Sequence, residues 1–149
     1  MAKYRFPFDT VRRVKALQRD EQRQRLADAF RAQDIVEHQQ QQLGTELSEL
    51  QNQQRQDLNR EHLNVNDLLA AQRYELVLNV QQQTLEKQSA MLAEEAERRR
   101  QSLVEAERGV QVMEKLDGRL QAAHQVQERR TETKQLDEIA QQRATSRRR

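Results

Sequence analysis

Apolar residues recur at a spacing of seven along much of this chain, with Gln at some of the repeat positions, and that repeat restricts the fold more than any other feature. In the first half, one position of the repeat holds Leu26, Gln33, Gln40, Leu47 and Gln54. The other position holds Ala29, Val36, Leu43, Leu50 and Asp57. Helices with a seven-residue apolar repeat coil around each other and bury the repeat in a narrow seam. We therefore expect long coiled-coil helices rather than a globular core.

The repeat continues in the second half of the chain, with one predicted irregularity. We expect its seam to hold Ala71, Tyr74, Leu78, Gln81, Leu85, Gln88 and Leu92. An added step of four to Ala96 predicts a stutter, which locally unwinds a supercoil. Near the N-terminus, Val11, Val14 and Leu17 lie on a shifted register, which predicts a slip of phase before Leu26.

A single break separates the two runs, around His62 to Asp67. Asn64, Asn66 and Asp67 are all capping residue types, and each is a possible start for the second helix. We predict an all-α fold in which two long helices form an antiparallel coiled-coil hairpin. The expected single domain, 1–149, has helix one at about 10–61, a turn at 62–67, helix two at about 68–142 and a basic tail at 143–149. Asp9 is the expected N-cap of helix one.

Helix two is the longer of the predicted pair. Counted outward from the turn, helix one runs out opposite roughly Leu120, and the chain from Gln121 onward has no partner in the hairpin. Leu136, Ile139 and Ala140 still form an apolar stripe at helical spacing there. An overhanging amphipathic helix end predicts a binding surface.

Composition argues against several classes of function. The chain has no cysteine, which excludes disulfides and thiolate metal sites and fits a reducing compartment. His38, His62 and His124 are scattered without metal-ligand spacing, and no Gly-rich phosphate loop is present. No stretch approaches the roughly 20 apolar residues of a membrane span. We expect a soluble cytoplasmic protein that is not an enzyme and needs no metal or cofactor.

Charge is unevenly distributed along the chain. Residues 1–25 hold eight Lys or Arg against three Asp or Glu, and residues 129–149 hold seven against three. A hairpin brings both termini toward one end, which would then be basic and suited to an acidic partner. Arg outnumbers Lys and suits phosphate, but the middle of the chain is net negative and offers no aromatic stacking platform. Nucleic acid is therefore not the expected partner.

Three segments carry a family resemblance that covers the whole length. The opening Tyr4-Arg5-Phe6-Pro7-Phe8-Asp9-Thr10-Val11-Arg12-Arg13-Val14 resembles the start of FliJ proteins. The run Val110-Gln111-Val112-Met113-Glu114-Lys115-Leu116 is similar to one in the family's C-terminal half. The stretch Lys134-Gln135-Leu136-Asp137-Glu138-Ile139-Ala140 follows it in the family's order.

The resemblance implies a non-enzymatic component of flagellar type III protein export. FliJ-like proteins are two-helix antiparallel coiled coils similar to the stalk of rotary ATPases. The family's member enters the ring of the hexameric export ATPase, FliI, and promotes ring assembly. It also contacts the cytoplasmic domain of the export gate, FlhA, and handles export chaperones. The implied location is the cytoplasm, at the inner membrane of the flagellar base, with membrane association only through the export apparatus.

Two sets of residues are the expected contacts. We place the ATPase ring at the basic end of the hairpin, on Phe6, Phe8, Arg12, Arg13, Lys134, Leu136 and Ile139. The family's gate-binding patch matches Tyr74 and Leu78, whereas Gln81 and Leu85 depart from its pattern. Seam packing is the alternative role for Tyr74 and Leu78.

Three alternatives remain open for the function. The first is the stalk of a virulence-type III secretion system, which would have the same fold in a different machine. The second is a generic dimeric coiled-coil scaffold. The third is a basic nucleic-acid binder.

Overall fold

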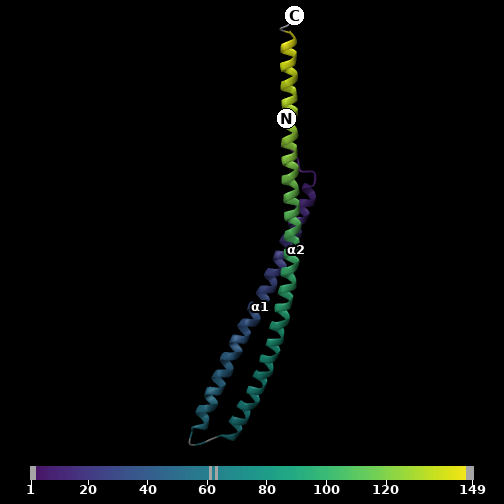
Figure 1. The fold of residues 1–149 in the computed structure, drawn as a ribbon. Helices are drawn as coiled ribbons and strands as arrows, with labels where there is room; N and C mark the ends of the chain where they lie inside the picture. The colour runs from purple at the N-terminus through teal and green to yellow at the C-terminus, as the bar shows by residue number, and fades with distance from the viewer. Residues whose placement is uncertain (1–2, 61, 63, 147–149) are drawn as a thin grey trace. The chain divides into compact units, whose positions relative to one another are not determined.

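The computed structural model describes residues 3–60, 62 and 64–146, which form two long helices and no strand. Helix α1 runs over Asp9–Leu58 and helix α2 over Val65–Ser146 (Figure 1). The predicted all-α fold of two long helices joined by a short turn is confirmed. The chain divides into two compact units. We call residues 21–103 the turn unit, and residues 1–20 together with 104–149 the terminal unit.

In the turn unit the two helices run antiparallel. Gln51 and Gln54, late in α1, hydrogen-bond Glu75 near the start of α2, whereas Arg25, early in α1, accepts a hydrogen bond from Arg99. The chain reverses direction in the few residues between the helices (Figure 1). The hairpin therefore closes within one chain, as the single break in the repeat predicts.

The turn starts α2 earlier than expected. The side chain of Asn64 accepts a hydrogen bond from the amide of Asn66 at 3.1 Å, and its carbonyl accepts one from the amide of Leu68 at 3.1 Å. Asn64 is therefore the N-cap, and α2 begins at Val65 rather than Leu68. The first helix ends at Leu58 instead of near Glu61, a residue that lies outside the described part, as does Leu63.

The start of α1 also differs from the expected cap. The amide of Arg12 donates to the carbonyl of Phe8 at 2.9 Å, so Phe8 occupies the capping position and Asp9 is the first helical residue. The Asp9 carboxylate instead pairs with the guanidinium groups of Arg12 and Arg13. A carboxylate in the first turn still suits the positive end of the helix dipole.

The seam of α1 follows the predicted heptad and extends it. Ala29, Val36 and Leu43 are buried, and the other predicted positions from Leu26 to Asp57 are half-buried. Toward the N-terminus the same frame continues without a slip through half-buried polar residues: Gln22, Arg19, Lys15 and Arg12. The predicted phase slip is wrong, because Val11, Val14 and Leu17 face outward and are 44 to 69% exposed. Long Arg and Lys side chains cover seam positions with their apolar stems.

The seam of α2 is also more regular than predicted. Its buried and half-buried positions include Ala71, Glu75, Leu78, Leu85, Ser89, Leu92 and Ala96. Tyr74, Gln81 and Gln88 are exposed, so they are not seam residues. Because Ser89 precedes Leu92 by three, the step of four to Ala96 continues the same heptad, in which Gln82 is the one position between 71 and 96 that is exposed. The predicted stutter is therefore absent.

Polar seam residues find partners across the interface of the turn unit. The Glu75 carboxylate accepts hydrogen bonds from the side-chain amides of Gln51 at 3.1 Å and Gln54 at 3.4 Å. The Arg99 guanidinium donates to the carbonyl of Arg25 at 2.7 Å and to the Glu95 carboxylate at 2.7 Å. The hydrogen bond from Arg99 lowers the pKa of the Glu95 carboxyl below its ordinary value. Polar groups between helices are tolerated when they are paired, and they help to fix the register.

Candidate functional site

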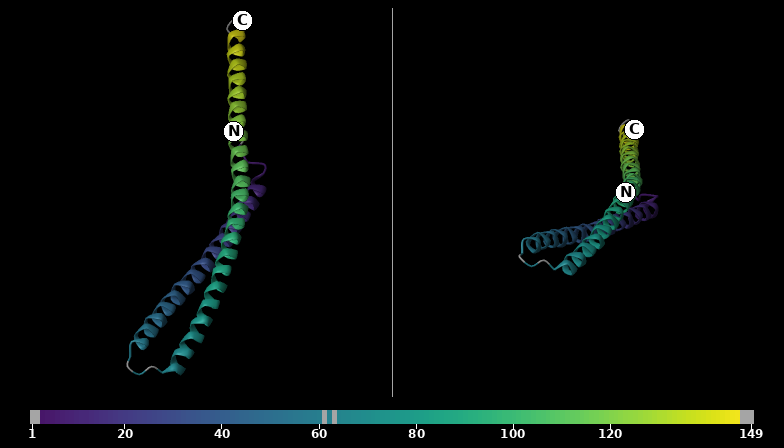
Figure 2. Two further views of the ribbon diagram at one scale, coloured as in Figure 1. Left: turned by 60° about the horizontal axis from the view of Figure 1, so that its bottom comes forward. Right: turned by 90° about the horizontal axis from the view of Figure 1, so that it is seen from below.

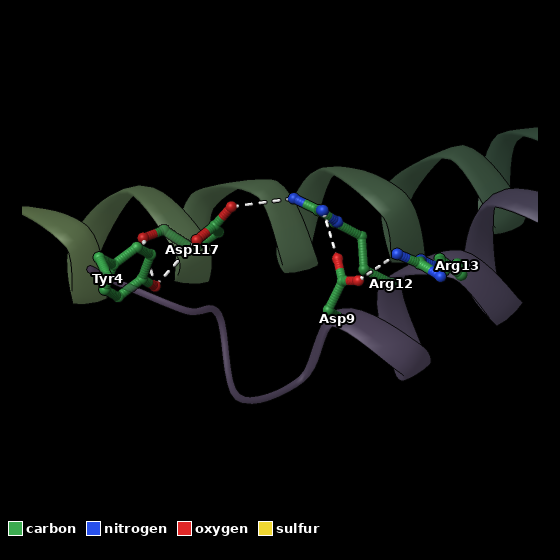
Figure 3. Close-up of polar contacts among 5 residues, drawn as sticks. All are labelled: Tyr4, Asp9, Arg12, Arg13 and Asp117. Atoms are coloured by element: carbon green, nitrogen blue, oxygen red, sulfur yellow. Dashed lines mark hydrogen bonds and ion pairs between the residues drawn. The ribbon is translucent and has the colours of Figure 1, made fainter. Parts of the chain in front are cut away.

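The segment before α1 contacts α2 through the carboxylate of Asp117. The Tyr4 hydroxyl donates to Asp117 Oδ1 at 2.9 Å, and an Arg12 guanidinium nitrogen lies 3.0 Å from Asp117 Oδ2 (Figure 3). Arg12 also pairs with Asp9, whose other oxygen lies 2.9 Å from Arg13. We call these five residues, Tyr4, Asp9, Arg12, Arg13 and Asp117, the clasp.

Aromatic rings surround the clasp. The Arg12 guanidinium lies 5.6 Å from the centroid of the Phe6 ring, within the range of a cation–π contact, and Phe6 meets the edge of Phe8 at 5.9 Å. The Tyr4 ring meets the His124 ring edge-on at 5.6 Å. The lead-in before α1 therefore lies beside α2 in the terminal unit (Figure 2). Pro7 suits this segment because it cannot donate the amide hydrogen bond of a helix interior.

The environment of the clasp perturbs its phenol. Burial against α2 raises the pKa of Tyr4, and the hydrogen bond to Asp117 raises it further. The phenol therefore remains protonated at neutral pH and keeps donating to the carboxylate. Asp117 and Tyr4 are candidate-site residues that the sequence did not predict. The signal available for Asp117 was its place seven residues after Val110 in the heptad frame.

The N-terminal half of the predicted ring-binding set gathers around the clasp. Phe6 and Arg12 are half-buried, and Phe8 is 46% exposed. Two carboxylates already contact Arg12, whereas 78% of the Arg13 side chain is exposed. Of the two arginines, Arg13 presents more of its charge to a partner.

The C-terminal half of that set lies further along α2. Lys134, Leu136 and Ile139 are exposed, with Leu136 at 66% and Ile139 at 48%. Every described residue from 129 to 146 is exposed, so α2 has an overhang, but the overhang begins later than the predicted Gln121, because His124 is half-buried and contacts Tyr4. At 1.5 Å per residue, Lys134 stands about 15 Å beyond His124 along α2 and Ile139 about 22 Å. The two halves of the set therefore do not touch, although both belong to the terminal unit.

The two predicted gate-binding residues have different environments. Tyr74 is 44% exposed, and its hydroxyl donates to the Glu46 carboxylate, which raises the pKa of the phenol. Leu78 is 2% exposed and is the most deeply buried large side chain of the described residues. Leu78 thus packs in the seam, which was its alternative role, and only Tyr74 presents a surface to a partner.

A shallow groove lies between the helices of the turn unit near Tyr74. It is lined by Gln39, Gln42, Leu43, Glu46, Val80, Gln81, Thr84, Leu85 and Gln88. Gln81 and Leu85, which depart from the family's pattern, both line it. Glu46, which holds the Tyr74 hydroxyl, also lines this groove. Tyr74 and the groove therefore form one continuous candidate surface of the turn unit.

Within residues 3–60, 62 and 64–146, no group of three or more His, Asp or Glu side chains could hold a metal ion. Over the same described residues, neither helix contains a segment both long and apolar enough to cross a membrane.

The sequence model of the family described as FliJ, flagellar FliJ protein, matches residues 4–149. The match begins at Tyr4, within the segment that forms the clasp, and includes both helices. No curated protein and no solved structure matches the chain.

Proposed function

Because this chain belongs to the FliJ family of flagellar proteins, we propose that it is a coupling and chaperone-handling component of flagellar protein export. In this proposal it binds the ring of the hexameric export ATPase, contacts the cytoplasmic domain of the export gate and receives export chaperones. It does no chemistry itself. It works on the cytoplasmic side of the inner membrane, where the export apparatus holds it. The observation that carries the proposal is the family match over residues 4–149.

The terminal unit supports the contact with the ATPase ring. Leu136 and Ile139 stand on a part of α2 whose described residues are all exposed, as a helix end that awaits a partner would be. Within the clasp, Arg13 adds a largely exposed positive charge. A single projecting helix with apolar and basic side chains has the dimensions to enter a pore, since its diameter is about 10–12 Å.

The experiment mixes the purified chain with the purified export ATPase. We expect a higher hydrolysis rate and a larger population of hexameric rings. A double variant, Leu136→Ser with Ile139→Ser, should reduce both effects, because it removes the apolar contacts of the overhang. The matched control is Val112→Ser, which changes a similarly exposed residue elsewhere on α2. If the chain left hydrolysis and ring assembly unchanged, the coupling role would be wrong.

The turn unit supports the contact with the gate. Tyr74 and the adjacent groove are accessible, and an aromatic ring with a polar tip suits a protein interface. Tyr74→Ala should weaken binding to the purified cytoplasmic domain of the gate. Tyr74→Phe, which keeps the ring and loses the hydrogen bond to Glu46, should retain binding to the gate domain. Equal affinity of the Ala variant and the parent would remove Tyr74 from the interface.

A further inference from the structure

An apolar surface lies on the side of α2 that faces away from the seam of the turn unit. It consists of Leu69, Leu76, Val77 and Val80 around Arg73, and we call it the outer patch. Its apolar side chains are 47 to 66% exposed. Outward positions of a coiled coil normally carry polar residues, because they gain nothing from burial within the rod. Of the outer patch, only Val80 also lines the groove beside Tyr74, and none of its residues belongs to the helix overhang.

The heptad frame shows why these side chains point outward. Leu69 and Leu76 precede the seam residues Ala71 and Leu78 by two positions. Arg73 and Val80 follow the same seam residues by two. A step of two residues turns the side chain by about 200° around the helix axis, away from the partner helix. The outer patch is therefore a second apolar stripe on α2, separate from the one that holds the hairpin together.

Arg73 gives the outer patch a chemical preference. It is exposed and makes no hydrogen bond or ion pair with any described residue, unlike Arg98, Arg99 and Arg100, which pair with glutamates. A positive charge in the middle of an apolar stripe favours a partner that brings carboxylates beside its own apolar side chains. A second copy of this chain fits poorly, because a two-fold contact centred on the outer patch would bring two Arg73 side chains together.

We propose that the outer patch docks an amphipathic helix of a partner protein whose apolar stripe is flanked by acidic side chains. From Leu69 to Val80 the outer patch extends over about 16 Å, which matches three turns of a partner helix. The apolar residues provide the contact area, and Arg73 selects acidic over basic partners. This site shares Val80 with the groove of the proposed gate contact but is otherwise separate from the proposed contacts with the ATPase ring and the gate, and it does not depend on them.

The test uses two labelled synthetic helices and the full chain. Both peptides are about 14 residues long, have leucines on one face, and differ only in carrying glutamates or lysines beside that face. Fluorescence anisotropy should show tighter binding of the glutamate peptide. The double variant Leu76→Ser with Val80→Ser should weaken this binding about tenfold or more, while Met91→Ser, an equally exposed control, should leave it unchanged.

Reversal of charge separates recognition from general stickiness. Arg73→Glu should invert the preference, so that the lysine peptide binds about two- to fivefold better than the glutamate peptide. Lys87→Glu makes the same change at the same heptad position two repeats later and should not invert it. Circular dichroism should show unchanged helicity for each variant. Equal binding of both peptides, absent binding, or a dimer of the parent that Val80→Ser dissociates would overturn the proposal.

Discussion

Leu78 and Leu76 give a sharp test of the seam, because they are two residues apart in sequence and opposite in environment. Leu78 is 2% exposed, whereas Leu76 is 66% exposed on the outer patch. Leu78→Ala removes three buried carbons, which amounts to about 2.4 kcal/mol at roughly 0.8 kcal/mol each. A thin two-helix seam can collapse partly around the gap, so the cavity adds little. We expect Leu78→Ala to cost about 2–3 kcal/mol of unfolding free energy.

The same truncation at Leu76 should cost less than about 0.5 kcal/mol, because the side chain is mostly in water already. Urea denaturation followed by far-UV circular dichroism measures both variants against the parent. The midpoint should fall for Leu78→Ala with an unchanged slope, since the surface exposed on unfolding remains similar. Equal costs at the two positions would refute the assigned register of α2.

Three further predictions concern the clasp, the pH dependence and the glycines. Asp117→Asn should cost less than about 1 kcal/mol globally, because the ion pair is partly exposed, but should speed amide exchange in the segment before α1. The pKa of Glu95 is lowered by Arg99, so its stabilisation is present near neutral pH and is lost as the pH falls through that lowered value. Glu95→Gln should therefore lose less stability than the parent when the pH is lowered, as measured by urea denaturation at neutral pH and again at acidic pH. Gly44→Ala and Gly118→Ala meet open space, and each should stabilise the protein by about 0.5–1 kcal/mol, measured as a higher urea midpoint.

Apolar spacing predicted the fold class and most of the α1 seam. It failed near the N-terminus, where Val11, Val14 and Leu17 suggested a frame that the structure does not use. Arg12 and Lys15 occupy the seam there. Their long apolar stems serve in place of a smaller hydrophobic residue, and a hydrophobicity pattern does not register such stems.

Some seam positions of α2 were predicted one residue too early, such as Tyr74 in place of Glu75, for a related reason. Tyr74 is more apolar than Glu75, so the predicted seam was placed on Tyr74. That placement then required a stutter at Leu92. In the structure Glu75 occupies the seam because Gln51 and Gln54 hydrogen-bond its carboxylate. The identity of a cross-helix partner is not available from the spacing of one helix.

Some candidate sites could be predicted from the spacing of residues along one helix, and others could not. The exposed overhang with Leu136 and Ile139 followed from counting residues outward from the turn. The clasp did not follow, because it depends on Tyr4 lying beside Asp117, and no pattern in the sequence links two residues that far apart. Only Tyr74 of the two predicted gate-binding residues is a surface residue, and this depended on the corrected frame.

The antiparallel hairpin within one chain is the central claim, and a crosslink tests it most directly. The chain has no cysteine, and a Cβ at position 109 would lie 3.5 Å from Lys15 Cδ. A double variant, Lys15→Cys with Gly109→Cys, treated at low concentration with a short bifunctional thiol reagent, should form a bridge within one chain and remain a monomer on a denaturing gel. Covalent dimers as the main product would contradict the hairpin and, with it, the proposed entry into the ATPase ring.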